Sequence, residues 1–297
     1  MRTRSQHEMH SRTPATEDAT TKPIKPGMKQ RWLVIILALT FLFVLMPFLF
    51  WQATWFGRPL NDAQLEKALA NVDQPREIQH ALSQVADRIL SPNPATRDSA
   101  RRFYPDVTRL AHTGGDEIRL TTAWVMGQDN AVPEFHQALS QLLEDPNPMV
   151  RRNAALSLVR FGDVAGRDEI RRILLPYAMA ASRNGKLVER LKPGDAINPG
   201  TLLGRVDADH EKFELRSQVP GTIERWLVQD GATIAVKQPV LNIDPSTSEV
   251  WEALRALYLV GEKQDLPSVE RFAQPQQGMP ADVRQQAAVT AREIESR

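Results

Sequence analysis

Two stretches far apart in the chain share one pattern of helix-forming residues, and a segment of a different kind lies between them. Residues 150–158 and 283–291 both begin with Val-Arg and continue through paired alanines at helical spacing. The segment that begins at Gly185 contains short apolar runs broken by Gly and Pro, which is typical of β-strands. The pattern predicts a helical array that is interrupted by an inserted β domain and then resumes.

Charge and cysteine content exclude several classes of protein. The 297 residues include 37 Lys and Arg and 36 Asp and Glu, which leaves a net charge of +1. This balance gives no electrostatic drive for non-specific nucleic-acid binding, so we expect no nucleic-acid partner. The chain has no cysteine, which excludes disulfides, thiolate nucleophiles, iron–sulfur clusters and Cys-ligated zinc. A hydrophobic content of 42% is sufficient for one or two folded units.

An uncharged apolar run near the N-terminus predicts a transmembrane helix. Residues 32–52 contain no charged side chain and reach the roughly 20 residues that a spanning helix needs. Trp32 and Trp51 lie at the two ends, as aromatic residues do at membrane interfaces. Residues 1–31 are polar, with lysines before the run, so we expect a disordered cytoplasmic tail. The run is followed by bulky aromatic residues, which favours an uncleaved anchor over a signal peptide.

Residues 58–177 show apolar residues at helical spacing, in pairs of short helices separated by turns. Ile78, Leu82 and Val85 form one such stripe, and Pro, Gly and Asn mark the turns. A single pair of helices cannot bury its own apolar stripe, so we expect the pairs to stack on one another. Residues 247–297 show the same spacing and are predicted to continue the stack.

The best-defined of these repeats carries a family resemblance. Asp145 and Asn147, Val150-Arg151, two alanines and Leu158 follow one another at fixed spacing, and Gly162-Asp163 ends the helix. This motif resembles a HEAT repeat of the short bacterial type. The resemblance implies that Asp145, Arg151 and Arg284 make structural links between layers rather than ligand contacts.

Residues 183–246 contain an internal duplication. Gly194 to Ile197 corresponds to Gly231 to Ile234, and further apolar residues repeat at the same separation. Two similar β halves predict a small pseudo-symmetric sandwich. The glycine turns and strand spacing of both halves resemble the biotinyl/lipoyl fold, also called the barrel-sandwich hybrid.

Carrier domains of that family bear a modified lysine at the hairpin between the halves, and this chain departs from that pattern. His210 occupies the position of the lysine, while Lys212 is displaced and flanked by Glu211 and Phe213. We therefore expect no attached cofactor and keep Lys212 only as an alternative modification site. The segment from Asp207 to Lys212 is also too short for the long helical hairpin of membrane-fusion adaptors.

No catalytic or metal-binding constellation is evident in the sequence. His80, His112 and His136 lack both paired spacing and an adjacent carboxylate, so we interpret them as surface or interface residues. Gly114-Gly115 lacks the preceding strand and following Lys of a phosphate loop and is predicted to be a turn. We expect a protein that is not an enzyme.

The whole pattern resembles bacterial membrane-anchored HEAT-repeat proteins that carry a biotinyl/lipoyl-like domain. The resemblance implies a multi-domain chain with a transmembrane helix, an all-α solenoid and an inserted all-β sandwich. It also implies a scaffold or adaptor for protein–protein interaction at the bacterial inner membrane, with extracytoplasmic domains, unidentified protein partners and a possible homo-oligomer. The alternatives are a transport- or secretion-related membrane-fusion-type adaptor and a lipoyl or biotin carrier.

Overall fold

The protein divides into two compact units, residues 1–58 and residues 59–297. The structure, a computed structural model, describes residues 28–53, 59–208, 211–275 and 278–297. Most of the tail predicted for residues 1–31 lies outside the described residues.

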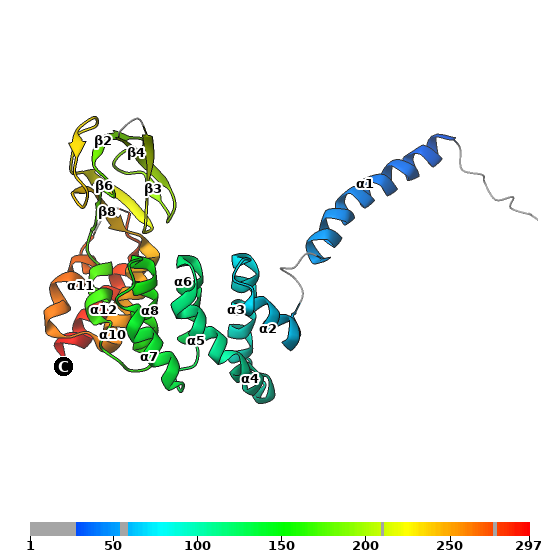
Figure 1. The fold of residues 1–297 in the computed structure, drawn as a ribbon, viewed down its shortest axis with the longest axis horizontal. Coiled ribbons are helices and arrows are strands. Elements are labelled where there is room, and N and C mark those ends of the chain that lie inside the picture. The colour runs from blue at the N-terminus through cyan, green and yellow to red at the C-terminus, as the bar shows by residue number, and fades with distance from the viewer. Residues whose placement is uncertain (1–27, 54–58, 209–210, 276–277) are drawn as a thin grey trace, which may run out of the picture. The chain divides into compact units, whose positions relative to one another are not determined.

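The first unit contains the helix α1 (Met28–Ala53) (Figure 1). Among the residues that the structure describes, none of the helices combines the length and the apolar character needed to span a bilayer. The predicted transmembrane helix at 32–52 is therefore wrong. The single-pass inner-membrane location, which depended on this helix, is wrong with it, and the described residues give no support for a membrane partner.

The second unit begins with an array of stacked helices (Figure 1). The helices are α2 (Asp62–Ala70), α3 (Pro75–Ile89), α4 (Pro94–Ala100), the 3-10 turn η2 (Arg101–Phe103), α5 (Tyr104–Thr113), α6 (Asp116–Met126), α7 (Pro133–Leu142), α8 (Pro148–Arg160) and α9 (Arg167–Ile173). The helices α3, α6 and α8 contact one another in that order and form a continuous row. One apolar cluster extends from Leu60 to Leu158 through this row, so each layer completes the core of the next.

Two helices of the array begin with the same local structure. The side chain of Asn147 accepts a hydrogen bond from the Met149 backbone N–H at 2.9 Å, which caps α8. Asn93 caps α4 in the same way by accepting from the Ala95 N–H at 3.0 Å. In each case a proline follows the cap and occupies the first turn. The segment from Ser91 to Pro94 therefore starts a helix as well as ending one.

The array resumes after the β insert. Its later elements are α10 (Thr247–Val260), η3 (Lys263–Asp265), α11 (Leu266–Ala273) and α12 (Ala281–Glu295). Helix α10 contacts both α8 and α9, so it packs directly on the last layer before the insert. A second apolar cluster joins residues from both sides, including Ala155 and Leu254. The predicted interruption and resumption of the helical array is confirmed.

The two similar sequence stretches occupy equivalent places in their layers. Val150 of α8 and Val283 of α12 are both buried. The Ser157 hydroxyl donates to the Ala123 carbonyl of the neighbouring helix at 2.8 Å. The Thr290 hydroxyl makes the same kind of bond to the Leu254 carbonyl at 3.0 Å. A repeated hydroxyl-to-carbonyl contact therefore links α6 to α8 and α10 to α12.

The insert folds into two antiparallel four-stranded sheets. The strands are β1 (Tyr177–Ala180), β2 (Gly185–Glu189), β3 (Ala196–Ile197), β4 (Leu202–Ala208), β5 (Glu211–Arg216), β6 (Gly221–Trp226), β7 (Thr233–Ile234) and β8 (Pro239–Pro245). The strand orders are β1-β8-β6-β3 and β5-β4-β2-β7. One buried cluster with residues from both sheets forms the core of this β module, residues 177–245. The sequence prediction started at residue 183 and missed β1.

The predicted internal duplication is visible in how the sheets exchange strands. The short strand β3 of the first half pairs with β6 of the second half, and β7 of the second half pairs with β2 of the first. Ile197 and Ile234, the equivalent residues of the short strands, are both buried. Each half therefore completes the sheet of the other. Gly194 and Gly231 begin the equivalent turns with positive φ angles of 93° and 77°, which glycine adopts without strain.

Close packing between α8 and α9 leaves no room for a side chain at Gly166. A Cβ atom there would lie 2.6 Å from the Cα atom of Ala155, which is backbone and cannot rotate away. We expect Gly166→Ala to lower the free energy of unfolding by about 1–3 kcal/mol through overpacking. Gly115→Ala is the matched control, since Gly115 also caps a helix and its Cβ would meet nothing within 4 Å. Urea denaturation measures both, and equal losses would contradict the packing explanation.

Candidate partner-binding cleft

A cleft of about 620 Å³ lies between the helical array and the β module. Its volume falls in the range of roughly 300–1,000 Å³ that is common for ligand sites. The helical wall consists of Asp116, Glu117, Leu120, Pro146, Asn147 and Met149, and the β wall of Met179, Ala180, Ser182, Pro199, Gly200 and residues 214–218. Segments at least thirty residues apart in the sequence, Met149 and Met179 being the nearest pair, therefore face one another across this space.

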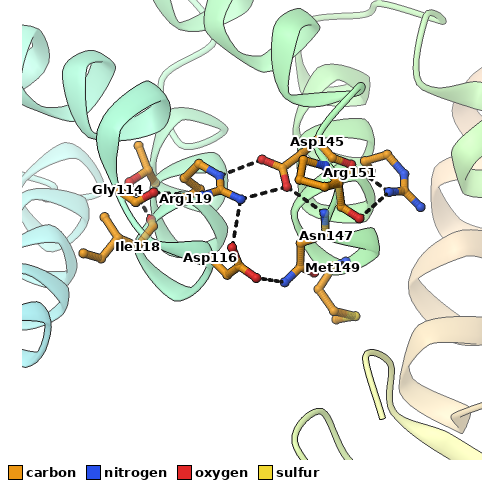
Figure 2. A network of polar contacts seen from close by, with 10 residues as sticks. Gly114, Asp116, Ile118, Arg119, Asp145, Asn147, Met149 and Arg151 are labelled. Atoms are coloured by element: carbon orange, nitrogen blue, oxygen red, sulfur yellow. Dashed lines mark hydrogen bonds and ion pairs between the residues drawn. The ribbon is translucent and has the colours of Figure 1, made fainter. Parts of the chain in front are cut away.

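A network of ion pairs and hydrogen bonds fixes the helical wall (Figure 2). The Arg119 guanidinium binds both oxygens of Asp145, at 2.6 and 3.0 Å, which joins α6 to the turn before α8. The same guanidinium donates to Asp116 at 3.0 Å and to the Gly114 carbonyl at 2.8 Å. Asn147 donates from its side-chain nitrogen to the second oxygen of Asp116 at 3.0 Å, which closes the network. Adjacent layers are thus locked together at the edge of the cleft.

Asp145 is the buried anion of this network. Burial alone would raise the pKa of its carboxyl, but hydrogen bonds from Arg119 and from the Asn147 N–H hold the pKa below the ordinary value of 3.8. The carboxylate is therefore charged at neutral pH. Because both of its oxygens accept hydrogen bonds, Asp145 acts as a structural link between layers.

The β wall is held by its own polar contacts. Arg216 pairs with Glu214 at 2.7 Å, and it donates to the Gly200 carbonyl at 2.6 Å. The Gly200 N–H in turn donates to the Ser217 carbonyl at 2.7 Å. Gly200 has a φ of 83°, which allows the tight turn that brings the 199–200 loop to the end of β5.

The charges in the cleft are predominantly negative. Three of its four ionisable lining residues are carboxylates, Asp116, Glu117 and Glu214, and the fourth is Arg216. Arg216 is neutralised by Glu214, whereas the exposed Glu117 side chain accepts, among the described residues, only a long hydrogen bond of 3.3 Å from Gln79. Apolar side chains from both walls accompany these charges. The combination of apolar surface and acidic groups is suited to binding a basic polypeptide segment.

A buried ion pair joins the helices on either side of the β module. Arg152 of α8 pairs with Glu249 of α10, and only 6% and 11% of their side chains are exposed. The Arg152 guanidinium also lies 5.9 Å from the ring centre of Tyr177, the first residue of β1. Burial raises the pKa of Glu249 against the opposing effect of Arg152. These contacts hold together α8, the start of the module and the helix that follows it.

The residues predicted to be structural occupy different environments. Arg151 donates to the Asp145 carbonyl at 2.7 Å and lies 3.5 Å from Glu169 of α9, so it links two helices. Arg284 is half-buried and forms no ion pair within the part of the chain that the structure describes. Gly114-Gly115 forms the turn before α6.

The histidines do not gather into one site. His136 lies 2.7 Å from Asp163, which the turn after α8 supplies, so the expectation of no neighbouring carboxylate was wrong for this residue. His80 contacts Gln84 at 2.8 Å, and His112 is exposed in the last turn of α5. Within the described residues no cluster of three or more His, Cys, Asp or Glu could hold a metal ion.

The predicted carrier position lies at the hairpin between β4 and β5. His210 itself lies outside the described residues. Lys212 is exposed on β5 and lies opposite Asp207 of β4 in the strand register.

The cleft could not be located from the sequence. Its two walls come from separate regions, and neither carries a recognisable binding motif. The spacing of Asp116 and Arg119 gave a weak signal, because an acid and an arginine three residues apart on a helix can pair. No sequence signal pointed to the Arg152–Glu249 pair, because no local pattern connects residues on either side of the insert.

The fold and the cleft define a class of helical-repeat scaffold with an inserted β module. Comparison with known families agrees with the helical part. Residues 107–176, from α5 to the end of α9, match the family model of HEAT repeats. This part of the chain is thus similar to HEAT repeats. No curated protein matches the chain.

Proposed function

We propose that the chain is a protein-interaction scaffold without catalytic activity of its own. It binds a protein partner in the cleft between its HEAT repeats and its β module. HEAT repeats generally serve protein interaction, and the match at residues 107–176 includes the helical wall of the cleft. The single observation that carries the proposal is this cleft, whose walls are fixed by the Arg119 network and by the Arg216 contacts.

Preorganised walls favour a binding role. A surface that is already ordered loses little conformational entropy when a partner binds. The carboxylates Asp116 and Asp145 are both held by Arg119, which suits them to structural support rather than to proton transfer.

We further propose that the β module is a non-carrier form of the biotinyl/lipoyl fold. The paired halves and their exchanged strands support this assignment. The position of Lys212 on β5, opposite Asp207, supports a use other than cofactor attachment. An intact-mass measurement of the protein from its own cells tests this point, because a carrier would show an added mass on the Lys212 peptide.

Affinity capture with the full chain tests the scaffold proposal. Glu117→Lys alters the helical wall and Ser182→Trp fills the β wall, and both residues are exposed. Glu134→Lys and Arg190→Trp are matched controls at exposed residues of α7 and of the β module away from the cleft. We expect a partner that wild type and both controls capture from a lysate of the native organism, and a loss of about tenfold with each cleft variant. The same proteins bound equally by all four variants would contradict the proposal.

A further inference from the structure

We propose that the cleft binds its partner by strand addition. In this arrangement an extended, basic segment of the partner pairs with the free edge of β5 and lies against the helical wall. The inference rests on the proposed scaffold function and specifies the chemistry of the partner. Strand addition uses backbone hydrogen bonds for affinity and alternate side chains for specificity.

Strand β5 has one unpaired edge. It is the first strand of the order β5-β4-β2-β7, and among the described residues it pairs only with β4. Its last three residues, 214–216, line the cleft. The backbone N–H and C=O groups on the outer edge are therefore available to a further strand at the site where a partner is expected.

The other sheet edge at the cleft is less suitable. Strand β1 contributes Met179 and Ala180, but it has four residues against the six of β5. Its pairing with β8 is also irregular between these two residues. Strand β5 pairs with β4 in regular register from Ala208–Glu211 to Gly204–Leu215 and shifts only before its last residue, Arg216, and it contains no proline. A longer regular edge offers more hydrogen bonds to an added strand.

The side chains around β5 select a basic, alternating segment. Leu215 points into the module and is buried, so it is not available to the partner. Arg216 is engaged by Glu214 and the Gly200 carbonyl. Asp116 is engaged by Arg119 and Asn147, so the exposed carboxylate of Glu117 on the facing helix is the group that attracts positive charge, while Met149 and Leu120 offer apolar contact. A strand with Lys or Arg on one face and small apolar residues on the other matches both the acidic and the apolar parts of this surface.

A fluorescein-labelled peptide of alternating Lys and Val is the probe for the full chain. Only alternate N–H groups of an added strand face β5, so two N-methylated versions, methylated at the Lys or at the Val residues, distinguish the edges of the peptide. We expect one version to bind at least ~10-fold more weakly and the other to bind nearly as well as the unmethylated peptide. Hydrogen exchange of residues 211–216 should slow when the peptide is bound.

Charge is tested separately. We expect Glu117→Gln to weaken binding of the Lys-Val peptide about threefold, whereas Glu134→Gln on α7 leaves the affinity unchanged. A Glu-Val peptide should not bind. Absence of Lys-Val binding, equal effects of the two methylation patterns, or unchanged exchange at 211–216 would each overturn strand addition. So would a doubled native mass with β5 protected in the free protein, because a second copy would then occupy the edge.

Failure of this inference can be told apart from failure of the scaffold proposal. If a native partner is captured and the cleft variants release it, the scaffold function stands whatever the peptide does. If the peptide tests then fail, the partner binds the cleft by side-chain contacts and strand addition is wrong. If no partner depends on the cleft, both proposals are wrong.

Discussion

Replacement of Arg152 by Met is expected to lower the free energy of unfolding by about 3–5 kcal/mol. The guanidinium pairs with Glu249, and both side chains are almost fully buried. Removal of the arginine leaves a carboxylate in a site with little water, where an unpaired charge is costly. One oxygen of Glu249 already has no hydrogen-bond partner among the described residues, so the arginine is its principal stabilising contact. Urea denaturation of the full chain measures the effect.

The double variant separates the charge from the packing. Arg152→Met combined with Glu249→Leu removes both charges and is expected to recover most of the lost stability, because an apolar pair of similar volume costs no desolvation. Arg255→Met is the matched control, since Arg255 is exposed on α10 and its loss should change stability by less than about 0.5 kcal/mol. A loss below 1 kcal/mol in the single variant, or no recovery in the double variant, would refute the role assigned to the pair.

Acid should reduce the penalty of Arg152→Met. Burial raises the pKa of Glu249 above its ordinary value of 4.5, so the folded state binds this proton more tightly than the unfolded state. A group of this kind stabilises the fold below the unfolded pKa, and the contribution is lost as the pH rises through the folded pKa. Without Arg152 the folded pKa rises further. The difference between variant and wild type should therefore be largest at neutral pH and smaller below pH 4.5.

Asp145→Ala is expected to lower the free energy of unfolding by about 3 kcal/mol at neutral pH. The change removes both hydrogen bonds to Arg119 and the acceptor for the Asn147 N–H, which lie at the contact between α6 and α8. Arg119 keeps Asp116 and the Gly114 carbonyl, so the loss should fall at the low end of the range for buried pairs. Asp87→Ala, at an exposed position of α3, is the control and should be nearly neutral.

The effect of Asp145→Ala depends on pH in a predictable direction. Its folded pKa is lowered below 3.8, so its contribution is present above the unfolded pKa and disappears as the pH falls through the folded value. The stability curves of wild type and variant should converge in acid. A difference that stayed constant down to acidic pH would show that the carboxylate charge contributes little, and the layer link would then be a packing effect.

The sequence pattern was sufficient to predict the repeating parts of the fold. Val150 and Val283 marked two equivalent helices, and both valines are buried as predicted. The spacing between Ile197 and Ile234 identified the two β halves, whose short strands are exchanged. Periodic burial is encoded locally, because the same face of each helix or strand must be apolar in every copy.

Contacts between segments far apart in the chain could not be predicted from the sequence. The Arg152–Glu249 pair joins helices on either side of the insert, and no local pattern records its existence. The bond between Asn147 and Asp116 likewise depends on how two layers stack. The apolar run at 32–52 is the reverse case, since its composition, length and flanking tryptophans predict a membrane span that the described structure does not support.

Site-specific photo-cross-linking in intact cells tests the central claim most directly. A photoreactive residue placed at Glu117 or at Ser182 reports on the two walls of the cleft, and placement at Glu134 or Arg190 reports on surfaces outside it. The scaffold account predicts one cross-linked partner shared by both cleft positions and absent from both outer positions. Cross-links from the outer positions alone, or different partners from the two walls, would contradict it.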